Sequence, residues 1–159
     1  MTFKSFSDYL LLEKNYSTHT VTAYVKDLES FSAFCKVEYE DGEIEKVNYS
    51  QIRSWIIKLV ENNISNRSIN RKVSSLNSYF KFLLKTETIT INPLTKHKAL
   101  KTEKKIQIPF SQKEVEAVLS DFQFENSFEG LRDKSIIELF YSTGIRRIEL
   151  VNIKLNDLN

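Results

Sequence analysis

The stretch STGIRRIEL, residues 142–150, combines residue types that could act on a phosphate. Gly144 ends one helical pattern, and Arg146 and Arg147 open the next, with Glu149 three residues after Arg146. A guanidinium is a planar fork that holds two phosphate or carboxylate oxygens at once. Glu149 shares a helix face with Arg146 and can limit its rotamers. By itself, however, the RxxE spacing is typical of a plain surface ion pair, worth at most about 0.5 kcal/mol.

A predicted helix over residues 66–86 carries a second candidate site. Opposite its apolar stripe, basic and hydroxyl side chains recur at spacings of three and four: Arg67, Arg71, Ser74, Ser78, Lys81 and Lys85. Residues 65–86 contain five basic groups and no acid. Helices that only need solubility usually mix signs, because opposite charges at i,i+4 stabilise them. The pattern therefore favours a row of phosphates, although a solvated lysine-rich face remains the alternative. The predicted contacts are Arg67, Ser68, Asn70, Arg71, Ser74 and Lys81.

A third candidate is the first turn of a helix of about twenty residues that starts at Ser17 or Thr18. His19 and Thr20 lie in this turn, where free backbone N–H groups can hold an anion. Hydroxyl residues at a helix start are also ordinary caps. We include His19 and Thr20 among the predicted phosphate contacts.

Composition excludes several other classes of site. With 159 residues, 41% hydrophobic content, three glycines and two prolines, the chain is neither disordered nor turn-rich β. Cys35 is the single cysteine, so no intrachain disulfide can form, and two distant histidines with one thiol make no metal set. No apolar run is long enough for a membrane span or a secretory signal. These features predict a cytoplasmic protein that binds no metal.

Charge distribution predicts the domain organisation. Residues 96–105 carry five lysines and Glu103, between a near-neutral block and an acidic one. This segment follows Asn92-Pro93 and has the composition of an exposed linker. We therefore predict a domain over 1–95, a basic and mobile linker over 96–109, and a second block over 110–159.

The first block shows helical periodicity throughout. Helices are predicted over 2–14, for about twenty residues after Ser17, over about 49–62 and over 66–86. The expected core residues are Phe3, Phe6, Leu10, Leu11, Val21, Tyr24, Leu28, Phe31, Cys35, Ile52, Trp55, Ile56, Leu59, Val60, Ile69, Val73, Leu76, Phe80 and Leu83.

The second block is also predicted to be helical, so the fold class is all-α. Ser111 and Glu114 form a capping box before a helix whose apolar face includes Val115, Val118, Leu119 and Phe122. A helix over about 130–142 ends at Gly144. Its apolar side chains are expected to be largely buried: Ile136, Ile137, Leu139, Phe140 and Tyr141. A block of about fifty residues cannot bury much surface, so Phe122, Phe140 and Leu150 are expected to be partly exposed, or covered by the N-terminal domain or by a second copy of the chain.

The run LRDKSIIELFYSTGIRRIELVNIKLNDLN resembles the start of the catalytic domain of the tyrosine recombinases, the family of integrases and Xer-type enzymes. Leu131-Arg132-Asp133, Tyr141, the TGIR run 143–146 and Glu149-Leu150 are in register with the family pattern. The first block resembles the family's SAM-like core-binding domain. One departure is Ile148, where a small serine is usual and a packing adjustment is expected.

The resemblance implies a chemistry for the opening stretch. These enzymes attack a DNA phosphodiester with a tyrosine, which gives a covalent 3′-phosphotyrosine and a free 5′-hydroxyl. Arg146 would be the first of two catalytic arginines, with Glu149 holding its guanidinium, and Arg147 a surface or backbone contact. No metal or nucleotide cofactor is needed, because the phosphotyrosine conserves the bond energy.

The resemblance also implies partners and limits. Double-stranded DNA and further protomers of the same recombinase are the expected partners. The family's nucleophilic tyrosine lies C-terminal to the TGxR motif, so the chain is expected to be a truncated catalytic domain that binds DNA without cutting it. The alternatives are a non-enzymatic helical DNA-binding regulator and a helical protein–protein adaptor.

Overall fold

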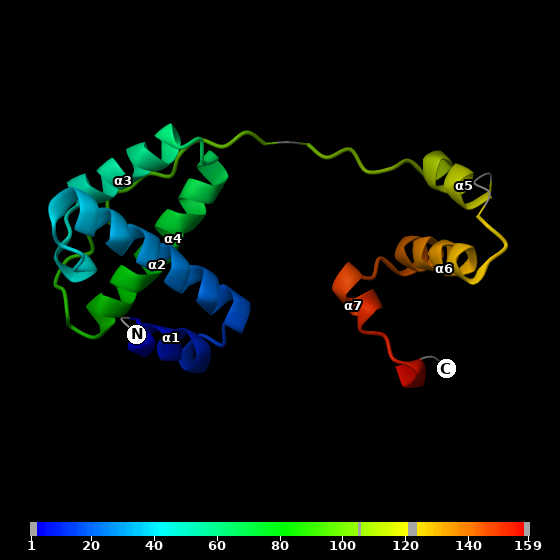
Figure 1. Ribbon diagram of the computed structural model, residues 1–159, viewed down its shortest axis with the longest axis horizontal. Helices are drawn as coiled ribbons and strands as arrows, with labels where there is room; N and C mark the ends of the chain where they lie inside the picture. The colour runs from blue at the N-terminus through cyan, green and yellow to red at the C-terminus, as the bar shows by residue number, and fades with distance from the viewer. Residues whose placement is uncertain (1–2, 105, 121–123, 158–159) are drawn as a thin grey trace. The chain divides into compact units, whose positions relative to one another are not determined.

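The computed structural model describes residues 3–104, 106–120 and 124–157 (Figure 1). The chain divides into two units, Met1–Lys104 and Lys105–Asn159, with the division inside the predicted linker. Every regular element within the described ranges is a helix or a helical turn, so the predicted all-α class is confirmed.

Four helices make up most of the first unit. In chain order its elements are α1 (Lys4–Asp8), the π-helical turn η1 (Tyr9–Glu13), α2 (Thr18–Tyr39), the 3₁₀ turn η2 (Ile44–Lys46), α3 (Tyr49–Glu61) and α4 (Asn66–Lys85). The predicted helices agree within a few residues, except that the first one changes from α to π geometry at Tyr9. Residue 2 of that prediction lies outside the described residues.

Side chains next to each long helix determine where it begins. The Ser17 hydroxyl accepts the Thr20 N–H (3.2 Å) at the start of α2, as predicted. Asn48 and Gln51 form a reciprocal capping box at α3. Such caps satisfy backbone donors that have no partner inside the helix and are worth about 1 kcal/mol each.

Helix α4 ends in a left-handed residue that reverses the chain. Glu87 has φ 55°. Its N–H donates to the Leu84 carbonyl (3.1 Å), and the Thr88 N–H donates to the Leu83 carbonyl (2.9 Å). This is the Schellman arrangement, with glutamate where glycine is usual. The chain therefore turns back toward α4 instead of continuing away from it.

The hydrophobic core of the first unit is close to the predicted one. The stripe of α4 is fully buried: Ile69, Val73, Leu76, Phe80 and Leu83. Trp55 is 2% exposed and packs against Phe31, with ring centroids 5.0 Å apart. Val60 was predicted to face inward, and this is wrong: its side chain is 49% exposed, because Leu59 takes the inward position in the last turn of α3.

Residues 92–101, which we call the strap, run back along α4. The Asn77 amide oxygen accepts from Asn92 Nδ2 (2.8 Å) at one end. Asn70 exchanges two hydrogen bonds with the Leu100 backbone, and Asn66 donates to the Lys101 carbonyl (2.8 Å). Most of the strap lies inside the predicted linker, yet these residues are tied to the first unit. In Figure 1 the chain leaves that unit beside the N-terminal end of α4.

The second unit contains α5 (Gln112–Ser120), α6 (Phe128–Thr143), α7 (Arg147–Val151) and the 3₁₀ turn η3 (Leu155–Asp157). The predicted capping box is confirmed, because Ser111 and Glu114 bond each other's backbone N–H groups. Gly144 ends α6 with φ 64°, also as predicted. Gly130 allows a close approach, since a Cβ there would lie 2.1 Å from the Glu125 carbonyl oxygen.

The second unit has little core among its described residues. The prediction of a largely buried α6 is wrong: Leu139 is 37% and Tyr141 51% exposed, and Ile136, Ile137 and Phe140 are only half-buried. Helix α5 packs along α6 on one side, which covers only part of a 16-residue helix. The expected partial exposure of Phe140 and Leu150 is confirmed, and Phe122 lies outside the described residues.

This arrangement predicts where a protease cuts first. Residues 102–104 and 106–110 are exposed and form no helix, whereas the strap is tied down up to Lys101. Limited trypsinolysis of the whole chain should therefore cleave first after Lys101 or Lys104, and mass spectrometry should find a stable piece that keeps the strap. Initial cleavage after Lys96, or inside α4, would contradict the strap as described.

Candidate nucleic-acid interface

The solvent face of α4 keeps the basic character that its sequence predicts. Arg67, Arg71, Ser74 and Lys81 are exposed on the side opposite the buried stripe, and Ser78 is half-buried. No ion pair or hydrogen bond is found for Arg67 or Lys81 among the described residues. Both side chains are therefore available to an anionic partner.

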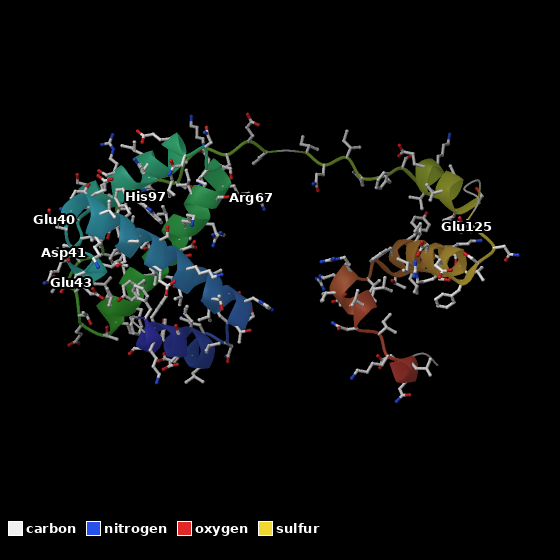
Figure 2. The ribbon with its side chains drawn as sticks, in the orientation of Figure 1. Glu40, Asp41, Glu43, Arg67, His97 and Glu125 are labelled. Carbon is white, nitrogen blue, oxygen red and sulfur yellow. The ribbon has the colours of Figure 1, made fainter. Side chains whose placement is uncertain are left out.

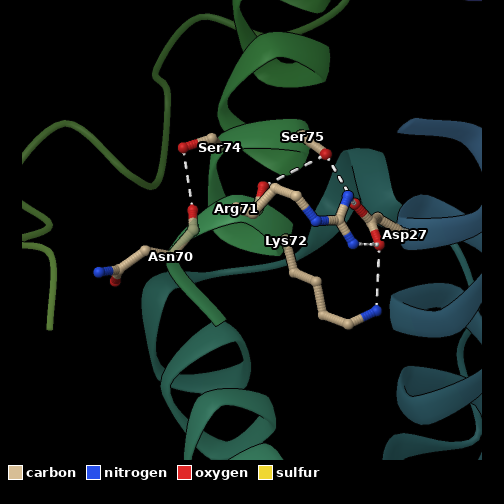
Figure 3. A network of polar contacts seen from close by, with 6 residues as sticks. All are labelled: Asp27, Asn70, Arg71, Lys72, Ser74 and Ser75. Carbon is tan, nitrogen blue, oxygen red and sulfur yellow. Dashed lines mark hydrogen bonds and ion pairs between the residues drawn. The ribbon is translucent and has the colours of Figure 1, made fainter. Parts of the chain in front are cut away.

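Arg71 has a more specific environment, which Figure 3 shows. Its guanidinium binds the Asp27 carboxylate of α2 through two hydrogen bonds, Nη1 to Oδ2 (2.7 Å) and Nη2 to Oδ1 (3.1 Å). Lys72 Nζ lies 3.0 Å from Oδ1, and the Ser75 hydroxyl donates to Oδ2 (2.8 Å). The Asp27 side chain is only 3% exposed. Residues of α4 thus surround a buried carboxylate of α2.

The charges in this network leave a surplus of one positive charge. Asp27 accepts four hydrogen bonds, which fills the acceptor sites of its two oxygens. Arg71 uses two of its five N–H donors on Asp27, and its side chain remains 51% exposed. The three other donors can bind a phosphate while the carboxylate fixes the plane of the guanidinium.

Three members of the network, Asp27, Lys72 and Ser75, are absent from the sequence prediction. Lys72 lies outside the predicted basic stripe. Asp27 lies on the apolar face of α2, three residues after Tyr24 and four residues before Phe31. A lone acid inside an apolar stripe signals a buried, paired charge, and this signal could have identified it.

Lys85, at the C-terminal end of the stripe, has its own partners. Its ammonium group forms an ion pair with Glu13 of η1 and lies 5.0 Å from the centre of the Tyr9 ring. The Glu13 hydrogen bond raises the pKa of Lys85. Because an acid neutralises this position, the basic face available to a partner extends from Arg67 to Lys81.

Three other predicted contacts use their polar groups within the first unit. Ser74 donates to the Asn70 carbonyl (2.9 Å), and Ser68 pairs with the capping Ser65 hydroxyl (3.0 Å). Asn70 donates to the Leu100 carbonyl and accepts the Leu100 N–H, both at 2.9 Å. These three residues therefore bond within the helix or to the strap, and Arg67 and Lys81 supply the positive charge of the α4 surface.

The start of α2 holds the remaining first-unit candidates. The Thr20 N–H and hydroxyl both bond the Ser17 hydroxyl, so Thr20 belongs to the cap. His19 is exposed. Burial raises the pKa of Tyr24, one turn further on, and the Arg71 guanidinium acts in the opposite direction.

Acidic residues gather elsewhere on the first unit. Glu40, Asp41 and Glu43 follow α2, and Figure 2 shows them on the opposite side of the unit from Arg67. An anionic partner is repelled from the acidic loop and attracted to the α4 face. Acidic and basic side chains thus lie on different sides of the first unit, although the net charge of the chain is only +2.

In the second unit, Arg146 and Glu149 form the predicted pair. Nη1 of Arg146 lies 2.9 Å from Glu149 Oε1, and the other carboxylate oxygen accepts the Arg146 N–H, also at 2.9 Å. Glu149 thus holds both the backbone and the side chain of Arg146 at the start of α7. The Arg146 side chain is 81% exposed, so its other donors point to solvent. Ile148, the position at which a packing adjustment is expected, is 61% exposed.

Two further classes of site are absent from the described part of the chain. No cluster of three or more His, Cys, Asp or Glu side chains there could hold a metal ion. Among those same residues, no helix is both long and apolar enough to cross a membrane.

Comparison with known proteins gives the family of the chain. The family described as "Phage integrase, N-terminal SAM-like domain" matches residues 3–87, which include all four helices of the first unit up to the end of α4. No solved structure gave a significant match to the chain.

Several curated relatives match almost the whole chain. The tyrosine recombinase XerC of Leptospira interrogans is 40% identical over 161 residues, which cover 99% of this chain and 51% of the relative. XerC of Listeria innocua is 38% identical, with 98% and 52% covered, and XerC of Bacillus subtilis is 35% identical, with 98% and 51% covered. The chain spans about half the length of the curated relatives it matches.

The buried carboxylate yields a stability prediction. Replacing Asp27 with asparagine places an amide N–H₂ among donors and leaves Arg71 and Lys72 without their counter-charge. Asp27→Asn should lower the free energy of unfolding of the first unit by about 2–3 kcal/mol. Urea titration monitored by the fluorescence of Trp55, the single tryptophan and a core residue of this unit, measures the change. Glu29→Gln, on the exposed face of α2, is the matched control, and an equal urea midpoint for both variants would contradict the prediction.

Proposed function

The chain belongs to the phage integrase family of tyrosine recombinases, and on this basis we propose that it binds double-stranded DNA as the N-terminal part of a site-specific recombinase. In this proposal α4 and the first turn of α2 contact DNA phosphates, and Arg146 serves the strand-cleavage step. Further protomers of the same recombinase on the DNA are the expected protein partners, and the cytoplasm is the expected location.

The observation that carries the proposal is the acid-free surface of α4. Arg67 and Lys81 are exposed without an acidic partner among the described residues, and Arg71 is held by Asp27 with three donors left. A surface that only needs solubility would pair such charges along the helix. A DNA backbone instead offers repeated phosphates that each basic side chain can neutralise.

The proposed role of Arg146 follows from the chemistry that the family resemblance implies. A tyrosine oxygen forms a bond to phosphorus and displaces the 5′ oxygen, which leaves as a hydroxyl. Negative charge grows on the non-bridging oxygens in the transition state. A guanidinium already oriented by Glu149 can bind two of these oxygens with parallel hydrogen bonds. The benefit is largest in the transition state, where the charge is greatest.

DNA binding gives the first test. Arg67→Ala and Lys81→Ala should each weaken binding of a fluorescently labelled duplex and reduce the slope of log K against log salt by about 0.9. Fluorescence anisotropy at several salt concentrations measures both quantities. The control is Lys36→Ala, an exposed lysine in the last turn of α2 beside Gly42 and the acidic loop. Unchanged affinity in the Arg67/Lys81 double variant, with an unchanged urea midpoint, would remove α4 from the interface.

Catalysis gives the second test, in a protein where this chain continues into a complete catalytic domain of the length found in the relatives. Arg146→Ala should slow formation of the covalent complex on a suicide substrate by about 10³-fold, with little loss of DNA affinity. Arg146→Lys should restore only part of the rate, because an ammonium cannot give two parallel bonds. The adjacent Arg147→Ala is the matched control and should react at nearly the parent rate.

The 159 residues alone should bind DNA without reacting with it. All seven tyrosines precede Arg146, whereas the resemblance places the nucleophile after it. A covalent adduct formed by these residues, detected by denaturing electrophoresis, would overturn the assigned roles.

A further inference from the structure

The asparagines of α4 form a row that faces the strap. Asn66, Asn70 and Asn77 stand at spacings of four and seven, which keeps them on one side of the helix. Each bonds a different point of the strap: Lys101, Leu100 and Asn92 respectively. The row spans about 16 Å of helix, at about 1.5 Å per residue.

The strap is held by more than this row. Leu94 is 5% exposed and belongs to the hydrophobic core, and the partly buried Leu100 packs against this core. Nδ1 of His97 lies 3.3 Å from the hydroxyl oxygen of Tyr49 in α3. Burial lowers the pKa of His97. The backbone of Leu100 has both its N–H and its carbonyl bonded to the Asn70 amide. A segment with lysine-rich composition is thereby fixed at its C-terminal end.

The tie at Asn66 places the backbone of Lys101 beside the first turn of α4. Asn66 holds the carbonyl of Lys101, and Arg67 is the next residue along α4. Figure 2 shows Arg67 at the end of α4 past which the chain leaves the unit. Lys101 is exposed and has no ion pair among the described residues. Lys98 instead borders a groove between the strap and α3, together with Arg53 and Glu61.

We propose that Lys101 joins Arg67 as a phosphate contact and that Asn66 and Asn70 are the positioning residues that place it there. The proposal rests on DNA binding as proposed above. Asn70, which the sequence suggested as a direct DNA contact, acts through the strap. With the strap fixed beforehand, the chain does not have to lose the backbone freedom of Leu100 and Lys101 when DNA binds.

The first measurement tests the ties themselves in the 159-residue chain. Hydrogen exchange should show a protected amide at Leu100, because its N–H donates to Asn70 Oδ1. Asn70→Ala should remove that protection without changing the urea midpoint by much. If Asn70→Ala does not fold, the variant Asn66→Ala takes its place in the binding measurements, because it loses only the single bond to the Lys101 carbonyl. A Leu100 amide that exchanges freely in the parent chain would overturn the proposal.

The second measurement tests the charge. Lys101→Ala should weaken binding to the labelled duplex about three- to tenfold and reduce the salt slope by about 0.9. Lys98→Ala, in the same strap but facing α3, is the matched control and should change affinity less. Equal losses from the two variants would mean that only the net charge of the strap matters, which would contradict a positioned contact.

A double-mutant cycle separates positioning from a merely structural role. The double variant Asn66→Ala/Asn70→Ala should weaken binding, and in that background Lys101→Ala should have little further effect, because both ties that place the lysine are lost. Fully additive losses would show that the two asparagines do not act through Lys101. If the parent chain binds DNA through Arg67 and neither strap variant matters, the inference fails alone. If the parent does not bind duplex DNA even at low salt, the proposed function fails.

Discussion

The carboxylate of Asp27 is the interaction on which the first unit most depends. It lies where α2 and α4 pack together, it is almost completely buried, and four hydrogen bonds from three α4 residues surround it. A buried carboxylate is costly unless such partners are present, so α4 can take only the rotation about its axis that presents Arg71, Lys72 and Ser75 to α2. That rotation also turns Arg67 and Lys81 toward solvent. The hydrogen bonds to Asp27 and the basic surface of α4 are thus both consequences of one orientation of this helix.

Polar ties also determine the path of the chain after α4. The left-handed turn at Glu87 reverses the backbone, and the asparagine row then leads the strap along the helix toward Arg67. Apolar contacts from Leu94 and Leu100 add stability, but they do not specify register as paired amide and backbone groups do. As a result the exit from the first unit lies beside the basic N-terminal end of α4.

The second unit follows a different principle, because few of its described side chains are buried. Local interactions define its structure: the capping box at Ser111, the left-handed Gly144 and the Arg146–Glu149 pair. These devices order short segments without requiring a core. Arg146 is therefore preorganised by a neighbour on its own helical turn, and its exposure leaves the remaining donors free.

The sequence by itself determined whatever depends on local chemistry. Helix positions, the caps at Ser17 and Ser111, the stop at Gly144, the buried stripe of α4 and the Arg146–Glu149 pair all arise from residues within a few positions of one another, which periodicity and capping rules can predict. The tertiary structure alone decided the rest. Asp27 and Arg71 are 44 residues apart, and Asn70 and Leu100 are 30 apart, so no local pattern could pair them. The exposure of Tyr141 likewise depended on how much protein packs on α6, since periodicity defines an apolar face but does not supply the surface that covers it.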